Sequence, residues 1–346
     1  MATIREVAAV AGVSRSTVSL VLNDSPLVKA ETREHVLSVI REMKYVPNNN
    51  ARSLSNKIMN SLGVIILLEY KGIASYDFDS NTGLFAEGVL RGIATELADT
   101  DYSVDIEYFK WNEDTEELPR LIKNKRVDGA CIIGNAYSQT MVDKIKELGI
   151  PIVTIEVGCS QMDIDCVFSD PQKGVLISLE HLMEKGHEKI CYLNGKPKAI
   201  SSKIRENAIR LAEQQYGLSF NWDWMVYCER NDGLGGYSAM KEAWESGIRP
   251  EVVLTANAEI ALGAERYLHE QGQRVPDDIS VMGYDDNAIS GYAIPALSTI
   301  NIRKDVMGQK AAELLLKRLD DPDRACEKIE VHPYLVERDS VRTIVR

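Results

Sequence analysis

The sequence predicts an α/β protein with three parts: a small helical head (residues 1–46), a hinge helix with a linker (47–60) and a two-lobed body (61–346). The first observation is a pair of short amphipathic helices joined at a glycine within the first 23 residues. The second is the length of 346 residues with 45% apolar residues, too long for one ordinary domain and enough for a substantial core. The third is a regular alternation of apolar runs and helical patterns after residue 60.

The first helix begins at a capping box. Thr3 is followed three residues later by Glu6, and this spacing lets the two residues satisfy free amide groups at a helix start. Gly12 then supplies the permissive backbone of a tight turn. The apolar residues between them recur at helical spacing and give the helix one buried face: Ile4, Val7, Ala8 and Ala11.

A second helix follows the turn, and Ser14 is its expected cap. Its spacing directs Val18, Val21 and Leu22 inward and leaves an outer face of Arg15, Ser16, Ser19 and Leu20. Two short helices around a glycine-containing turn are typical of the helix-turn-helix unit, whose second helix enters the DNA major groove. A third helix is expected from Glu31 to Lys44, closing the core with Val36, Leu37, Ile40 and Met43.

The outer face carries side chains suited to DNA. Arg15 can fork onto a guanine, Ser16 can bond several bases, and Leu20 can touch a thymine methyl group. Alternatively, the hairpin is an ordinary helical pair that binds nothing. Charge favours DNA, because residues 1–60 carry eight Lys/Arg against five Asp/Glu, a balance of +3, whereas the remaining residues carry −15, which gives the net charge of −12. Residues expected at phosphates are Thr3, Ser14, Thr17, Asn23, Lys29 and Tyr45.

The segment after Pro47 predicts a helix of only about two turns, which is marginal in water without support. Asn48 can cap it, and Leu54 is its sole large apolar side chain. One interpretation is a solvated linker. The other is a minor-groove element, in which paired helices of a dimer insert Leu54 as a wedge at a base step. The residues that would lie beside that wedge are Ala51, Arg52 and Ser55.

Short apolar runs and helical patterns alternate through the body. The expected strands are 61–68, 127–134, 150–156, 189–195, 250–256 and 278–286. The expected helices are 84–98, 138–148, 171–185, 201–215, 235–246 and 257–271. This alternation predicts parallel sheets with helices on both faces, and ligands of such sheets bind beyond the carboxyl ends of the strands.

The head resembles the lactose-repressor/galactose-repressor family of bacterial transcription regulators. The family's pattern of valine-serine, threonine-valine-serine and a Val-Leu-Asn close is present from Val13 to Asn23, and its hinge pattern is Ala51-Arg52-Ser53-Leu54. The resemblance implies a repressor that recognises DNA through Arg15, Ser16 and Leu20, although Leu20 departs from the polar residue often found there. It also implies a homodimer on a palindromic operator, since the chain ends without a leucine-heptad tail.

The body resembles the same family, which implies a fold similar to periplasmic sugar-binding proteins with three crossings between the lobes. The stretches that carry this resemblance include "HLMEKGHEKICYLNG" and "PALSTI". The crossings are expected near Asp163, Ile302 and Arg324. One subdomain would then hold about 61–162 and 303–323, and the other about 163–302 and 324–346.

The resemblance also assigns an effector site between the lobes. It comprises Phe85, Glu156, Arg205, Asn231, Asn257 and Asp285. An arginine fork and carboxylates suit polyol or anion recognition, so a small polar effector, a sugar or sugar derivative, is expected. Alternatively, Arg205 is a surface charge and Asp285 caps a turn. Ala258 after the asparagine, Asn231 in place of an aromatic and Pro171 after Asp170 all depart from the usual sugar pocket.

Other classes of protein are poorly supported. The six cysteines contain no CxxC pair and the five histidines no HExxH arrangement, so neither a metal nor a cofactor is expected. No phosphate loop or nucleophile elbow is present, which argues against an enzyme. The alternative class is a solute-binding receptor without DNA function. Such a receptor needs export, but the amino terminus lacks a signal pattern and no membrane span is expected, so we predict a cytoplasmic protein.

Overall fold

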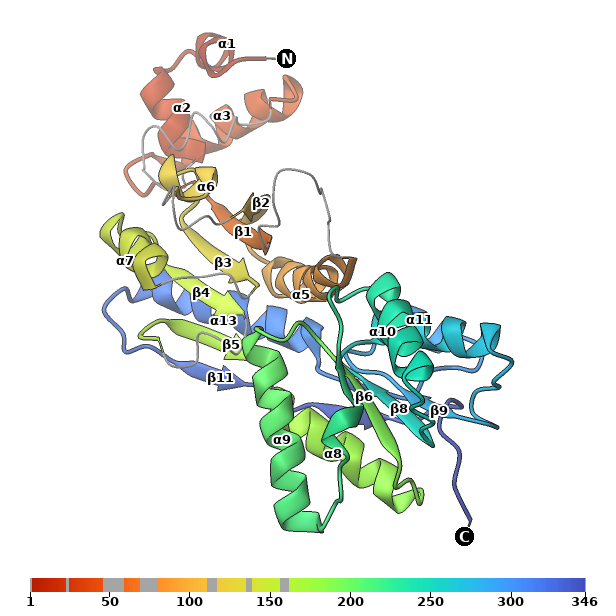
Figure 1. Cartoon of the computed structure of the whole chain (residues 1–346). Coiled ribbons are helices and arrows are strands. Elements are labelled where there is room, and N and C mark those ends of the chain that lie inside the picture. Colours follow the sequence, from red (N-terminus) through yellow and green to blue (C-terminus); the bar gives the residue numbers. More distant parts are fainter. Residues whose placement is uncertain are drawn as a thin grey trace. The chain divides into compact units, whose positions relative to one another are not determined.

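The computed structural model describes residues 2–22, 25–45, 59–68, 80–110, 117–134, 139–155 and 162–345, with only the backbone at 80–82. It divides into two compact units, Met1–Asn60 and Ser61–Arg346, and each is described by itself (Figure 1).

In the described residues of the first unit, three helices form a head. Its helices are α1 (Ile4–Val10), α2 (Arg15–Leu22) and α3 (Ala30–Glu42). The predicted capping box is confirmed, because the Thr3 amide donates to Glu6 Oε2 at 2.8 Å and the Glu6 amide donates to Thr3 Oγ1 at 3.4 Å. Gly12 has a φ of 66°, the left-handed turn conformation that glycine adopts without strain. The core is formed by Val7, Ala8, Ala11, Val18, Val21, Val36 and Val39.

One core prediction in the third helix is wrong. Leu37 is 37% exposed, and Val39 is buried in its place. The reason is the helical period: position 37 lies about 100° round the helix from the buried Val36, whereas position 39 returns to the same side. The helix also ends at Glu42, two residues earlier than predicted, and Tyr45 packs against the core from the segment that follows.

The second unit contains two parallel sheets, as predicted. The larger has the order β11-β5-β4-β3-β1-β2 and we call it, with its helices, the N-lobe. Its strands are β1 (Ser61–Leu68), β2 (Ser103–Lys110), β3 (Gly129–Ile133), β4 (Ile152–Ile155), β5 (Asp165–Phe168) and β11 (Lys328–Glu330). Its helices are α5 (Ser80–Leu97), α6 (Arg120–Lys123), α7 (Gln139–Glu147) and α13 (Lys304–Asp320). All five strand pairings are parallel.

The smaller sheet has the order β7-β6-β8-β9 and defines the C-lobe, with three parallel pairings. Its strands are β6 (Ile190–Asn194), β7 (Met225–Tyr227), β8 (Val252–Thr255) and β9 (Ser280–Met282). Its helices are α8 (Pro171–Glu184), α9 (Ile200–Tyr216), α10 (Gly233–Glu245), α11 (Ala258–Glu270) and α12 (Ala288–Tyr292), with a 3-10 turn at Trp222–Trp224. A two-stranded antiparallel ribbon, β10 (Thr299–Asn301) with β12 (Tyr334–Val336), completes the unit.

Successive side chains of a strand point to opposite faces of the sheet. In the larger sheet, each face packs against its own pair of helices. In β1, Val64 and Ile66 join the core beneath α5 and α13, whereas Ile65 and Leu67 join the core beneath α6 and α7. The α5 and α13 helices also approach each other closely. A Cβ added at Gly92 would lie 1.8 Å from the Asp305 carbonyl oxygen, so glycine is required at this crossing.

Two predicted crossings between the lobes differ from the structure. Strand β5 pairs with β4, so the N-lobe continues past the predicted crossing at Asp163 to Phe168. Strand β11 pairs with β5, so the last crossing follows Glu330 and not Arg324. These two strands have only four and three residues, so hydrophobic pattern alone does not reveal them. Ile302, where the remaining crossing was expected, lies between β10 and α13.

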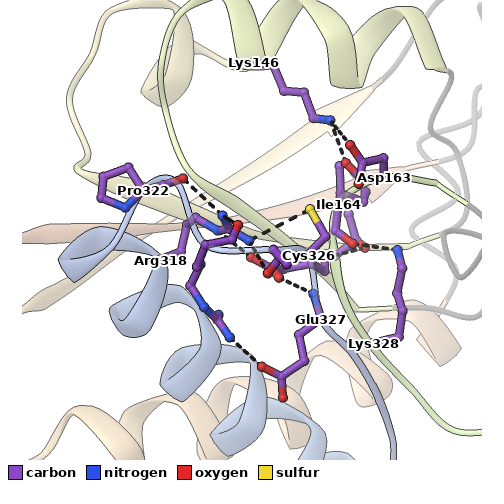
Figure 2. A network of polar contacts seen from close by, with 12 residues as sticks. Lys146, Asp163, Ile164, Arg318, Pro322, Cys326, Glu327 and Lys328 are labelled. Carbon is purple, nitrogen blue, oxygen red and sulfur yellow. Dashed lines mark hydrogen bonds and ion pairs between the residues drawn. The ribbon is translucent and has the colours of Figure 1, made fainter.

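A polar network holds β5 and the segment before β11 to α13 (Figure 2). Arg318 Nε donates to Asp165 Oδ2 at 2.8 Å, and the Glu327 amide donates to Asp165 Oδ1 at 2.8 Å. The Arg318 guanidinium also donates to the carbonyl oxygens of Pro322 and Ala325, each at 3.1 Å, and to that of Arg324. One side chain therefore shapes the whole connection from α13 to β11.

Candidate DNA-contacting head and effector site

The second helix presents the predicted polar face. Ser14 caps it, because the Thr17 amide donates to Ser14 Oγ at 3.0 Å. Arg15 and Ser16 are exposed on its first turn, Ser19 is partly buried, and Leu20 is 37% exposed. A helix anchored at its start with an arginine free of the core on its first turn matches the geometry needed to reach base edges.

The predicted phosphate contacts have mixed surroundings. The hydroxyls of Ser14 and Thr17 lie 2.9 Å apart and bond each other, and the Thr3 side chain is engaged in its capping box. Lys29 is exposed directly before α3, whereas Tyr45 packs partly on the head core. The other predicted DNA contacts lie outside the described residues: Asn23, Asn48, Ala51, Arg52, Leu54 and Ser55.

In the C-lobe, polar side chains gather at the carboxyl ends of the strands. Gly195 follows β6 directly, and a Cβ added there would lie 3.1 Å from Ser202 Oγ, 3.1 Å from Asn231 Oδ1 and 3.8 Å from an Arg205 nitrogen. The absence of a side chain at Gly195 therefore leaves these three groups close together. With Tyr284 and Asp285, which follow β9, we call them the strand-end cluster: Ser202, Arg205, Asn231, Tyr284 and Asp285.

Arg205 is not a solvated surface charge. Its guanidinium carbon lies 5.5 Å from the centre of the Tyr284 ring, a cation–π distance, and its Nε is buried with no hydrogen-bond partner among the described residues. Asp285 is only 8% exposed and has a φ of 78°. Burial raises the pKa of Asp285, while the charges of Lys304 and Arg205 oppose that rise. The cluster therefore places a partly buried cationic fork close to a buried carboxylate.

Asn257 is linked to the strand-end cluster by a hydrogen bond to the backbone of Asn231. Its Oδ1 accepts the Ile260 amide at 2.8 Å as the cap of α11, and its Nδ2 donates to the Asn231 carbonyl oxygen at 2.9 Å. Asn257 therefore fixes the backbone at Asn231 and keeps one amide hydrogen for another partner. Phe85 of α5 packs against the cores of both lobes, and Glu156 lies outside the described residues.

Sequence reasoning missed several groups beside the cluster. Tyr192, on the central strand β6, is fully buried, and the hydroxyls of Tyr192, Ser202 and Tyr284 have no hydrogen-bond partner within the described ranges. Unpartnered buried hydroxyls are rare in proteins, because each costs about 1–3 kcal/mol. Lys304, at the start of α13, is also buried and reaches the loop that carries Asp285. Nothing in a single sequence marks these residues as parts of one site.

Other chemistries have little support in the described part of the chain. It contains no group of three histidine, cysteine or acidic side chains placed to hold a metal ion. Burial raises the pKa of Cys131, Cys191 and Cys228 to about 12, so these thiols stay protonated and unreactive near neutral pH. None of its helices has the length and apolarity needed to cross a bilayer.

Two protein-family models match the chain. Residues 3–48 match the bacterial regulatory proteins of the lacI family, and residues 179–341 match a periplasmic binding protein-like domain. Together, the fold, the strand-end cluster and these matches define a DNA-binding regulator with a receptor-like body.

Similar proteins agree over the full length. The HTH-type transcriptional repressor PurR of Mannheimia succiniciproducens is 33% identical over 354 residues, covering 99% of this chain and 100% of the relative. The lac repressor dimer bound to operator and the anti-inducer ONPF is 26% identical with a TM-score of 0.79, covering 99% of both chains. A CelR–cellobiose complex is 25% identical with a TM-score of 0.70, covering 98% of this chain and 100% of that one.

The chain belongs to the LacI family of bacterial regulatory proteins. It is a DNA-binding transcriptional regulator, which confirms the resemblance found in the sequence. The alternatives of an enzyme and of a receptor without DNA function are wrong for this chain.

Proposed function

We propose that this protein is a repressor whose operator affinity is controlled by a small polar effector bound at the strand-end cluster. The observation that carries the proposal is that Arg205, whose Nε is buried without a partner among the described residues, and the buried Asp285 lie in one cluster at the carboxyl ends of the C-lobe strands, where parallel sheets bind ligands. One solved relative is bound to operator and an anti-inducer, and another is bound to cellobiose. Both support a protein that binds a small molecule as well as DNA. The N-lobe and C-lobe are the two bodies whose relative position the effector would change.

At the DNA, Arg15, Ser16 and Leu20 read base edges in the major groove, and Leu54 of the hinge wedges into the minor groove. The exposed first turn of α2 supports the first part, and the hinge motif in the sequence supports the second. Leu54→Ala should weaken binding to operator much more than binding to random DNA, because the wedge acts only where the duplex is kinked. Equal losses on both DNAs, measured by fluorescence anisotropy, would count against the wedge.

The effector is a sugar, a sugar derivative or a similar polar metabolite gripped mainly by hydrogen bonds. The cluster offers an arginine fork, a carboxylate and several hydroxyls, but Asn231 occupies the place where many family members have a stacking aromatic. A thermal-shift screen that includes cellobiose and other sugars should give stabilising ligands, and Arg205→Leu should abolish their effect. Stabilisation only by hydrophobic or nucleobase ligands, unchanged in Arg205→Leu, would contradict this chemistry.

We further propose that the protein acts as a homodimer on a palindromic operator in the cytoplasm, where the DNA is. The operator-bound relative is a dimer, and two-fold symmetry would place the half-sites about one helical turn apart. The C-lobe carries an exposed apolar side chain suited to such a contact. Leu234 is 63% exposed at a pocket of about 430 Å³ that Tyr237 and Leu262 also line.

A further inference from the structure

Lys304 is a buried lysine that connects the two lobes of the body. It is the first residue of α13 and is only 9% exposed. Its stem lies against α5 of the N-lobe, because a Cβ added at Gly88 would lie 2.8 Å from Lys304 Cβ and 3.4 Å from its Cδ and Cε. Lysine is almost never this buried unless its charge is compensated, so this placement requires an explanation.

The amine of Lys304 reaches across to the C-lobe. Its Nζ donates to the Asp285 carbonyl oxygen at 2.6 Å and to Asn287 Oδ1. These bonds hold a strained loop, since Asp285 and Asp286 have successive φ values of 78° and 38°. Left-handed backbone at residues other than glycine is strained and persists only when its surroundings impose it.

The neighbour Asp286 is fixed by other partners. Its carboxylate accepts from Arg338 at 2.8 Å and from Asn301 at 2.9 Å, so both of its oxygens are engaged. The Asp285 carboxylate, by contrast, accepts no hydrogen bond from any residue in the described ranges, and it is the group assigned to the effector. The loop therefore presents one carboxylate to the ligand while Lys304 holds its backbone.

Charge links the same groups. Burial lowers the pKa of Lys304, and the negative charges of Asp285, Asp286 and Glu87 oppose that change while Arg91 supports it. A ligand that bonds to or shields Asp285 therefore alters the balance that keeps the Lys304 amine charged. The stem of the same side chain lies between α13 and α5, so a change at the amine acts directly on the packing of two N-lobe helices.

We propose that Lys304 is a positioning residue that couples the effector site to the N-lobe, by tying the backbone of the 285–287 loop to the α5–α13 helix pair. This inference rests on the proposed effector-controlled DNA binding. Coupling between two binding sites is reciprocal. If the effector site controls DNA binding, binding of operator DNA must in turn change the 285–287 loop. Operator DNA can then serve as the probe before the effector is known.

The test is hydrogen exchange measured by mass spectrometry on the full-length protein, with and without a duplex selected from random DNA. In the wild-type protein, DNA should protect residues 3–22 and change exchange within 283–289 about five-fold or more, the lower range of typical coupling. Lys304→Met keeps an unbranched stem but loses the donor, and should retain the protection of 3–22 while the change at 283–289 falls below about two-fold. The matched control is Lys310→Met, which removes the half-exposed lysine that bonds Glu313 on the same helix and should behave as wild type.

The outcomes separate this inference from the proposed function. Lack of any protected head residue would overturn DNA binding itself, and the coupling with it. Protection of the head with an unchanged 283–289 segment in wild type, a full change in Lys304→Met, or a lost change in Lys310→Met would each overturn the coupling role alone. If Lys304→Met does not fold, Asn287→Ala removes only one acceptor and should reduce the change by at least half; a full change in that variant would also overturn the role.

Discussion

Arg318 should be a major source of stability in the N-lobe, and Arg318→Met tests this. The Arg318 side chain is 12% exposed and its partner Asp165 is 1% exposed, so the ion pair is sheltered from water. After the substitution, the Asp165 carboxylate keeps the Glu327 amide at 2.8 Å but loses its cationic partner. Removing one partner of a buried pair costs about 3–5 kcal/mol because the remaining charge is left uncompensated. Since the released carbonyl oxygens of Pro322 and Ala325 can reach water, we take the lower end, about 3 kcal/mol.

Differential scanning calorimetry of the full-length protein measures the effect. At about 2–4 °C for each kcal/mol, the melting temperature of the body should fall by about 6–12 °C. Lys317→Met on the same helix is the matched control, because its pair with Glu313 has side chains 51% and 33% exposed and should contribute less than about 1 kcal/mol. A double-mutant cycle with Asp165→Asn should give a coupling of at least about 1 kcal/mol. A melting temperature for Arg318→Met equal to that of Lys317→Met would refute the reasoning.

Three further predictions follow from single side chains. Burial raises the pKa of Glu265 from 4.5 to about 8, and its Oε1 has no hydrogen-bond partner within the described residues. The folded state therefore binds this proton more tightly than the unfolded state does. The stability linked to the protonated Glu265 is fully present below pH 4.5 and is lost as the pH rises to about 8. Glu265→Gln should accordingly raise the melting temperature at pH 8 and change it little at pH 5; an equal shift at both would contradict the assignment. Leu234→Glu should convert the dimer to monomer in light scattering, whereas the control Tyr216→Glu, at a 45% exposed residue of α9, should leave the mass unchanged. Arg15→Met should cost about 1–3 kcal/mol of operator affinity and relax the preference at one base position, and an unchanged selected sequence would exclude it from base recognition.

The elements with strong local signals were predictable. Thr3 and Glu6 form the capping box, Ser14 caps α2, and β1 occupies the predicted residues 61–68. These signals depend only on neighbours within a few residues. The parallel sheets also followed from sequence, because buried parallel strands are continuous apolar runs between helices.

What escaped prediction depends on contacts between distant segments. The half-exposed edge strand β2 and the short strands β5 and β11 have weak patterns, and α13 was assigned to a lobe without being identified as a helix. In the site, Arg205 and Asp285 were assigned by resemblance, and the structure buries Asp285 and the Nε of Arg205. Lys304 was missed because a lysine at a helix start suggests a solvated charge, and only the fold shows the glycine of α5 against which it lies.

The most direct test of the central claim is selection of bound DNA from a random pool by the full-length protein, repeated in the presence of candidate sugars. We predict recovery of a palindrome with half-sites about one helical turn apart, and a change in its recovery with at least one polar metabolite. Recovery of no preferred sequence at moderate salt, with or without any of these metabolites, would contradict the account.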